Sequence, residues 1–296
     1  MRNKQNERLY RLMTLPGLIF LVLFSYIPMF GIVIAFQRFV PALGIFRSPF
    51  FGLGNFEYMF DLPEVGQVFF NTVFIALCKI VAGQIVPIIF ALLLNEVTTI
   101  WFKKTVQTIV YLPHFLSWVI LGTIFKQMLG FTGIVNSVIT GLGGEVIQFL
   151  GDGSWFRFII IITDVWKGFG FGTIVYLAAI LAINPSLYEA ATIDGANRFQ
   201  RILHITIPCM APTIVLMATL SLGGVLNAGF DQIFNMYNPL VYQAADILDT
   251  YVYRIGLINM QYGLSTAVGL LKSVISSILI VVSYTLAYKF AGYRIF

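Results

Sequence analysis

The segment WFRFIIIITDVWKGFGFGTIVYLAAILAI, residues 155–183, decides the class of fold. It is long enough to cross a bilayer as a helix, which needs about 20 predominantly apolar residues. Its apolar residues are continuous, whereas the strands of a membrane β-barrel alternate apolar and polar residues over about ten positions. The segment therefore predicts a membrane-spanning helix.

The composition of the whole chain agrees with a membrane protein. Of its 296 residues, 58% are hydrophobic and only 10% are charged, whereas soluble domains have roughly 45–50% and about 25%. A soluble fold of this length could not cover its surface with so few charges. A soluble enzyme, a disordered protein and a nucleic-acid-binding domain are thereby excluded, and the net charge of +5 is explained by membrane topology.

Other apolar stretches are also long enough to span a bilayer. The first is longer than the apolar core of a signal peptide and no small-residue cleavage site follows it, so we expect a retained helix. We expect one all-α transmembrane domain over residues 1–296. Its six spans are predicted at residues 12–36, 68–94, 105–129, 155–183, 209–229 and 262–287.

The distribution of Lys and Arg predicts the orientation, because basic residues concentrate on the cytoplasmic side of a membrane protein. One side carries ten basic and four acidic loop residues, and the other carries three basic and eight acidic ones. The ten basic residues are Arg2, Lys4, Arg8, Arg11, Lys103, Lys104, Arg198, Arg201, Lys289 and Arg294. Both termini and the loop 184–208 are therefore expected in the cytoplasm.

Polar side chains within the spans are costly to bury in lipid, so they are candidates for function. Asp164 and Lys167 lie three residues apart on one helix face and can pair, either as a structural clasp or beside a hydrated path. Lys79 and Lys272 have no obvious partner within their own helices. With two tryptophans, for which simple packing is the alternative, the candidates for a translocation path are Lys79, Gln84, Trp118, Asp164, Trp166, Lys167, Asn227 and Lys272.

A glycine series, Gly168-Phe-Gly170-Phe-Gly172, lies inside the span 155–183. It is not placed between a strand and a helix, as a dinucleotide-binding loop would be. Gly168 and Gly172 form a GxxxG pattern, which favours close packing against another helix. A local break that lines a pathway is the alternative.

The chain has no motif for chemistry of its own. It lacks a GxxxxGK[ST] nucleotide-binding loop, and it lacks the GxSxG and HExxH signatures of hydrolases and metalloproteases. Cys78 and Cys209 do not indicate a disulfide framework, and His114 and His204 cannot form a metal site without further ligands. We expect no catalytic residue, metal or bound cofactor in this chain.

The loop NPSLYEAATIDGANRFQRILHITIP, residues 184–208, carries the strongest functional signal. It predicts two short helices joined by a turn at Gly195, because glycine tolerates a positive φ. The first helix begins either at Asn184, with Pro185 in the first helical position, or at Ser186 as part of a capping box. The result is a compact helical knob exposed to the cytoplasm.

This loop resembles the EAA loop of the membrane subunits of binding-protein-dependent ABC importers. That loop reads Glu-Ala-Ala, three residues, Gly, nine residues, Ile, one residue and Leu-Pro, and the departure here is Ile207 in place of Leu. In the family this loop is the coupling helix that docks into a cleft of the ATPase subunit. The resemblance implies that Glu189 contacts the ATPase and that Gly195 makes the bend. The positions so assigned to ATPase coupling are Glu189, Ala190, Ala191, Asp194, Gly195, Ile205 and Pro208.

Further segments resemble the oligosaccharide and polysaccharide branch of these permeases, which is maltose-permease-like. They are LPGL (15–18), YIPM (26–29), GLGNF (52–56), ALLLNE (91–96), QTIVYLPHF (107–115) and DTYVYRIG (249–256). The resemblance implies a type I ABC importer permease fold in a bacterial plasma membrane. It also implies a second homologous permease as heterodimer partner, two ATPase subunits that use ATP and Mg, an extracellular solute-binding protein and an oligosaccharide substrate.

Two rival functions and one question of substrate are left open. An ion-coupled secondary transporter or channel would explain Lys79, Asp164 and Lys272 equally well, but it would not explain the loop 184–208. The second rival, a membrane enzyme, is disfavoured because this chain has no catalytic constellation. The sugar is either neutral, which leaves the lysines within the spans structural, or acidic, which gives them partners.

Overall fold

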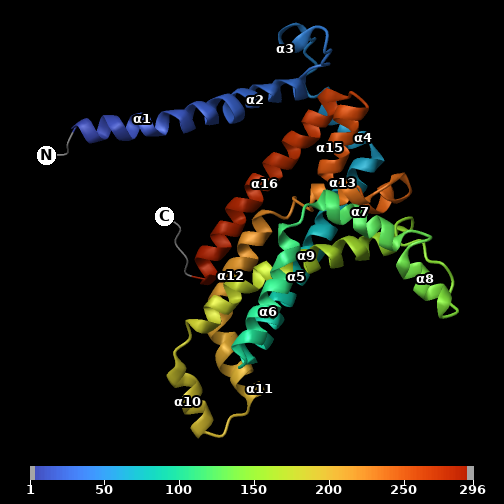
Figure 1. Ribbon diagram of the computed structural model, residues 1–296. Coiled ribbons are helices and arrows are strands. Elements are labelled where there is room, and N and C mark those ends of the chain that lie inside the picture. Colours follow the sequence, from blue (N-terminus) through green and yellow to red (C-terminus); the bar gives the residue numbers. More distant parts are fainter. Residues whose placement is uncertain (1–3, 292–296) are drawn as a thin grey trace. The chain divides into compact units, whose positions relative to one another are not determined.

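Helices account for most of residues 4–291, which are the residues that the computed structural model describes (Figure 1). Six of them are long and apolar enough to cross a membrane, which confirms the predicted all-α class with six spans. These spans are Tyr10–Phe36, Pro63–Glu96, Trp118–Gly141, Gly153–Leu181, Arg198–Gly223 and Tyr262–Leu286. Arg2 and Arg294, which entered the orientation argument, lie outside the described residues.

The described chain forms two compact units, one from residues 4–63 and 252–271 and the other from residues 64–251 and 272–291. The first unit contains α1 (Lys4–Leu21), a π-helical turn (Val22–Tyr26), α2 (Ile27–Met29), a 3-10 helix (Phe30–Phe36), α3 (Gly44–Arg47) and α4 (Gly54–Asp61). It also contains a π-helical turn (Arg254–Ile258) and the beginning of α16 (Tyr262–Ala291).

A proline explains the change of helix type in the first span. Pro28 has no N–H, and its ring crowds the carbonyl group four residues earlier. The helix is wider just before this residue, where the Ile27 N–H donates to the Val22 carbonyl, five residues back. Such single-turn π-bulges keep a helix continuous across a local misfit.

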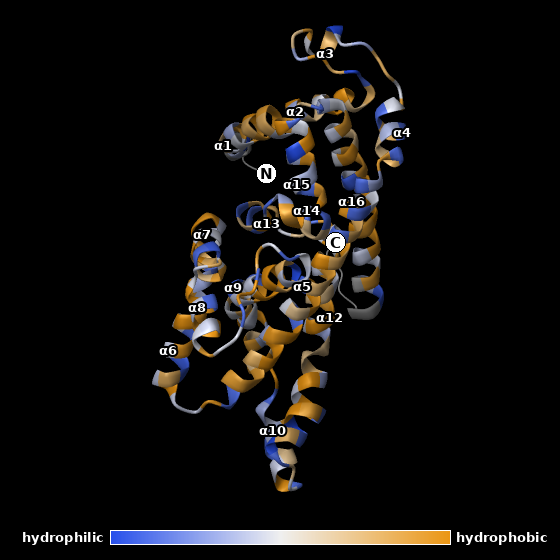
Figure 2. Ribbon diagram, turned by 90° about the vertical axis from the view of Figure 1, so that its right-hand side faces the viewer, coloured by the Kyte–Doolittle hydropathy of each residue, from blue (hydrophilic) through white to orange (hydrophobic). Residues whose placement is uncertain are grey.

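The second unit contains most of the spans. Its elements are α5 (Pro63–Glu96), α6 (Ile100–Tyr111), a 3-10 turn (Leu112–Phe115), α7 (Trp118–Leu129), α8 (Ile134–Gly141), α9 (Gly153–Leu181), α10 (Pro185–Ile193), α11 (Arg198–Arg201), a π-helical turn (Ile202–Thr206), α12 (Ile207–Gly223), α13 (Phe230–Met236), a 3-10 turn (Pro239–Val241), α14 (Tyr242–Ala245) and α15 (Leu248–Tyr253), followed by the rest of α16. Helix α9 packs against α6 and α12, and the hydrophobic colour of Figure 2 covers much of α9 and α12.

The structure differs from the predicted spans in two places. The expected span 105–129 is interrupted after Tyr111, because Pro113 cannot donate a backbone hydrogen bond and Ser117 caps a new helix by accepting from the Ile120 N–H. The expected span 209–229 ends at Gly223, where the paired glycines 223 and 224 terminate the helix. Both departures follow from helix-terminating residues within an apolar run, which hydropathy alone does not detect.

The glycine series in α9 packs closely against neighbouring helices, as predicted, but the closest contact is made by a different glycine from those predicted. A Cβ atom at Gly170 would lie 2.1 Å from the carbonyl oxygen of Val110 in α6, and one at Gly172 would lie 3.3 Å from Cγ of Pro87 in α5. A Cβ at Gly168 would meet nothing within 4 Å. The predicted role of Gly168 in packing is therefore wrong, and Gly170 allows the close approach instead. Helix α9 is continuous through the series, so the alternative of a local break is also wrong.

Candidate functional site

Helix α10 begins at Asn184, whose side chain accepts a hydrogen bond from the Ser186 N–H at 3.1 Å. Pro185 occupies the first helical position, where its missing N–H has no cost. Of the two predicted starts, the structure has the one at Asn184.

The turn after α10 has the hydrogen bonds of a Schellman motif. Gly195 adopts a φ of +77°, its N–H donates to the Thr192 carbonyl at 3.1 Å, and the Ala196 N–H donates to the Ala191 carbonyl at 2.9 Å. This pair of bonds satisfies carbonyl groups that the helix end would leave without a partner. The predicted bend at Gly195 is confirmed.

The sequence predicts a second short helix in the latter half of this segment. In the structure, this half is instead the beginning of the fifth span. Asn197 and Gln200 form a capping box at the start of α11, which joins the π-helical turn and α12 without a break. The π-helical turn Ile202–Thr206 lies just before Pro208, in the same way that the π-helical turn of the first span lies just before Pro28. The chain is therefore continuously helical from Arg198, just after the exposed turn, through the fifth span.

Two further contacts join the two arms of the segment 184–208. The Tyr188 hydroxyl lies 2.9 Å from the Thr206 hydroxyl, which is buried. The guanidinium of Arg201 donates to the Thr192 hydroxyl at 3.2 Å. These bonds brace α10 against the helix that leads into the membrane, and Figure 1 shows α10 and α11 projecting beyond the ends of α6 and α12.

The residues assigned to coupling lie at or near the surface of this projection. Five of them are exposed (Glu189, Ala190, Asp194, Gly195 and Pro208), and two are half-buried (Ala191 and Ile205). Three large apolar side chains beside them are also exposed, by 45% at Leu187, 86% at Ile193 and 71% at Phe199. Exposed apolar groups gathered on a polar projection are typical of an interaction surface.

A cavity of about 310 Å³ lies within the second unit, between α5, α9 and the segment that follows α12. Its polar lining includes Lys79, Gln84, Asp164, Ser221 and Asn227. Four of the residues predicted for a translocation path therefore meet at one cavity: Lys79 and Gln84 come from α5, Asp164 from α9, and Asn227 from the segment after α12.

Lys79 is almost completely buried and holds this cavity wall together. Its ammonium group donates to the Ala228 carbonyl at 2.7 Å and to the Gln232 side chain, and it lies 3.5 Å from the Asp164 carboxylate. Gln232 in turn donates to the Ile160 carbonyl at 2.7 Å. The interaction is thus between helices, and the predicted pair of Asp164 with Lys167 is wrong.

Gln84 connects two further spans at the same cavity. Its side chain accepts a hydrogen bond from the Tyr176 hydroxyl in α9 and donates to the Ser221 hydroxyl in α12 at 3.2 Å. The sequence does not indicate either partner, because the residues that meet belong to different spans.

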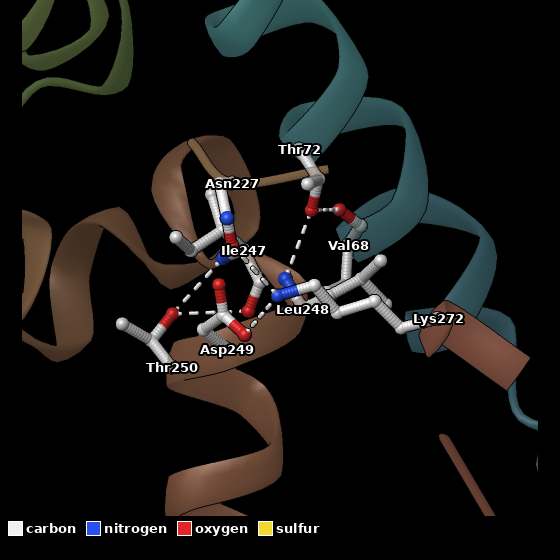
Figure 3. Close-up of polar contacts among 8 residues, drawn as sticks. All are labelled: Val68, Thr72, Asn227, Ile247, Leu248, Asp249, Thr250 and Lys272. Atoms are coloured by element: carbon white, nitrogen blue, oxygen red, sulfur yellow. Dashed lines mark hydrogen bonds and ion pairs between the residues drawn. The ribbon is translucent and has the colours of Figure 1, made fainter. Parts of the chain in front are cut away.

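Lys272 is paired at a different point beside the cavity (Figure 3). Its ammonium group forms an ion pair with Asp249 and lies 3.2 Å from the side-chain oxygen of Asn227. Asp249 is the first residue of the segment DTYVYRIG, which the sequence marked by resemblance without assigning it a role.

Besides Lys272, three predicted path residues, Trp118, Trp166 and Lys167, do not line the cavity. Lys167 donates to the His114 carbonyl at 2.9 Å, and its ammonium group lies 5.6 Å from the centre of the Trp118 ring. Trp166 packs edge-on against Phe125, with ring centres 5.8 Å apart. These contacts agree with the alternative expectation for the two tryptophans, which was simple packing.

Comparisons with known proteins are consistent along the whole chain. Residues 83–292 match the family described as "Binding-protein-dependent transport system inner membrane component". Two relatives are from Bacillus subtilis strain 168. Protein LplB is 42% identical over 288 residues, which cover 97% of this chain and 90% of LplB. The polygalacturonan/rhamnogalacturonan transport system permease protein YteP is 44% identical over 287 residues, which cover 97% of this chain and 89% of YteP.

A solved structure shows the same architecture. It is the crystal structure of a bacterial alginate ABC transporter in complex with an alginate pentasaccharide-bound periplasmic protein, and one of its chains is 36% identical with a TM-score of 0.89 over 98% of both chains. Together with the six spans and the segment 184–208, these matches show that the chain belongs to the family of inner membrane components of binding-protein-dependent transport systems, as a multi-pass permease subunit of an ABC importer.

Proposed function

We propose that this chain forms half of the translocation path of an ATP-driven importer of acidic oligosaccharides, and that residues 184–208 couple the path to a separate ATPase. Residues 1–296 act in this proposal as one transmembrane permease domain. The observation that carries it is the exposed, hydrogen-bonded helical segment 184–208 at the spacing of the EAA loop.

A coupling element must transmit a rigid-body movement, so it has to resist bending. The Schellman turn at Gly195, the capping box at Asn197 and the bond between Tyr188 and Thr206 each remove a point of flexibility. Glu189 and the exposed apolar side chains of Leu187 and Ile193 supply the contact surface. This arrangement supports a docking helix better than a passive connector.

An acidic substrate is favoured by the relatives and by the charges near the cavity. Polygalacturonan and alginate, which appear in the descriptions of YteP and of the solved transporter, are both polymers of uronic acids. The ammonium group of Lys272 contacts Asn227, which lines the cavity. Ammonium groups recognise carboxylates by charge-assisted hydrogen bonds, so a uronate oligosaccharide fits this path better than a neutral one.

The remaining parts of the machine come from partners. A second homologous permease completes the path, two ATPase subunits bind ATP and Mg, and an extracellular solute-binding protein delivers the sugar. ATP binding draws the two coupling segments together and opens the path outward, and hydrolysis resets it. This chain contributes the path and the coupling, and both of its termini and residues 184–208 lie in the cytoplasm.

The test replaces the carboxylate on the coupling helix. In an importer reassembled in proteoliposomes, Glu189→Ala should leave the ATPase subunits bound but lower ATP-driven uptake by roughly tenfold, the loss typical of one charge-assisted contact. ATP hydrolysis should continue, so that the two activities are uncoupled. Glu145→Ala is the matched control, because Glu145 is equally exposed but lies in the loop between α8 and α9.

Two outcomes would contradict the proposal. Uptake that continues without any ATPase subunit but requires a proton or sodium gradient would identify a secondary transporter. Uptake of a neutral oligosaccharide with exclusion of an oligogalacturonate would refute the acidic substrate while leaving the coupling intact.

A further inference from the structure

The ion pair of Lys272 with Asp249 joins two helices, α15 and α16. Lys272 belongs to α16 and Asp249 to the first turn of α15, and the ammonium group of Lys272 reaches toward both Asp249 and Asn227 (Figure 3). Because Asn227 lines the cavity, the ammonium group is one hydrogen bond away from the cavity wall.

Asp249 stands on a firmly held turn. The N–H of Leu248, its neighbour, donates to the Thr72 hydroxyl of α5 at 2.9 Å. On the other side, the Thr250 hydroxyl accepts from the Ile247 N–H at 3.0 Å and donates to the Asp246 carboxylate at 2.6 Å. These bonds fix the backbone on both sides of Asp249, so the carboxylate has a defined position while the lysine that meets it is on a long, flexible side chain.

The two lysines at the cavity differ in how fully they are bonded. An ammonium group has three N–H donors. Lys79, with 8% of its side chain exposed, has three partners in Ala228, Gln232 and Asp164. Lys272 is 17% exposed and has two, Asp249 and Asn227, among the residues that the structure describes. Lys79 is thus saturated by the protein, whereas Lys272 retains a donor.

We propose that Lys272 is the specificity-determining residue for substrate carboxylates, and that Asp249 occupies the place of the substrate's carboxylate until the substrate arrives. This inference rests on the proposed acidic substrate. It concerns the exchange of one ionic partner for another, and no covalent bond changes.

Exchange explains why a path for an anion carries an internal carboxylate. An unpaired ammonium group within a span is costly, so the resting path needs a counter-ion. When a uronate replaces Asp249, the ammonium group remains paired, and Asp249, with 26% of its side chain exposed, can be hydrated. A neutral sugar offers no carboxylate, so Lys272 stays paired with Asp249 and contributes nothing to its binding.

The test compares the binding of a charged ligand with that of its uncharged ester. Fluorescently labelled trigalacturonate and its methyl ester are titrated into the importer assembled from this chain, its partner permease and the ATPase subunits in nanodiscs. The solute-binding protein is left out so that its selectivity does not enter. The double variant Asp249→Asn/Lys272→Gln removes both charges at once, which avoids leaving one of them unpaired.

The wild-type importer should prefer the acid, and the double variant should lose this preference by about tenfold or more, the factor expected for a charge-assisted hydrogen bond. Its affinity for the ester should change little. The matched control is Lys79→Gln/Asp164→Asn, which neutralises the other ion pair at the cavity and should change the binding of acid and ester by the same factor.

The single variant Asp249→Asn separates recognition from a structural role. If Asp249 competes with the substrate, its removal strengthens the binding of the acid several-fold without strengthening that of the ester. If the pair only holds α15 to α16, both ligands bind more weakly, and the proposal is overturned. A double variant that keeps the preference for the acid would overturn it as well. Equal wild-type binding of acid and ester would instead refute the acidic substrate itself, before any variant is made.

Discussion

Gly195 is the residue on which the shape of the segment 184–208 depends. Its φ of +77° lies in the left-handed region, which costs a residue with a Cβ atom roughly 1–2 kcal/mol. A Cβ atom built there would meet nothing within 4 Å. The requirement for glycine is therefore one of backbone conformation and not of space.

This distinction gives a prediction at the residue scale. Gly195→Ala should weaken the Schellman turn and lower ATP-driven uptake several-fold, whereas Gly195→Asn should retain more uptake, because Asn enters the left-handed region more readily. Uptake into proteoliposomes and co-purification of the ATPase subunits measure the effect. Equal activity of the alanine variant and the wild type would show that the bend is not required.

Sequence reasoning at this scale identified charged residues but not their partners. Asp164 was matched with Lys167 because the two share a helix face, yet its partner is Lys79 from another span. Lys272 was singled out, whereas Asp249 was counted as an ordinary loop residue. Gln232 went unnoticed, although a polar residue shortly after Gly229, at the end of an expected span, was a usable signal.

The pair of helices α6 and α9 shows how one glycine sets the distance between two elements. Gly170 is buried and faces the Val110 carbonyl group, while Gly168, half a turn earlier, faces open space. Small residues at a contact allow helix backbones to approach closely within a membrane. The sequence pattern predicts this contact at Gly168 and Gly172, whereas Gly170 makes the closest approach, because a GxxxG spacing does not determine which face of α9 meets its neighbour.

The two glycines provide a matched pair of variants at the element scale. Gly170→Ala should force α6 and α9 apart and destabilise the protein by about 1–3 kcal/mol, the usual cost of overpacking. Gly168→Ala should be neutral or stabilising by up to ~1 kcal/mol, because alanine favours the helix. Thermal unfolding of the purified permease complex measures both. Similar melting temperatures for the two variants would contradict the assigned contact.

For the whole molecule, the orientation in the membrane follows from charge and stays a prediction. The segment 184–208 carries Arg198 and Arg201, and the opposite loops carry an acidic excess. Because positively charged loops are retained in the cytoplasm, α10 should be accessible from inside the cell and the loop between α8 and α9 from outside.

Labelling of single cysteines tests this orientation. In a chain with Cys78→Ala and Cys209→Ala, a membrane-impermeant maleimide added to intact cells should label Glu145→Cys and should label Ser186→Cys only after permeabilisation. Both positions are exposed, so a difference in labelling reports the side of the membrane. The reverse pattern would invert the topology and place the coupling segment out of reach of the ATPase.

The sequence by itself determined the helical class, the six spans and the bend of the coupling segment. These depend on local properties, namely the hydropathy of a run of residues and the φ that glycine permits at Gly195. Only the tertiary structure decided the role of Gly170 and the partners of Lys79 and Lys272. The physical reason is that an ion pair or a close helix contact depends on which helix faces meet, and the faces that meet belong to segments far apart in the chain.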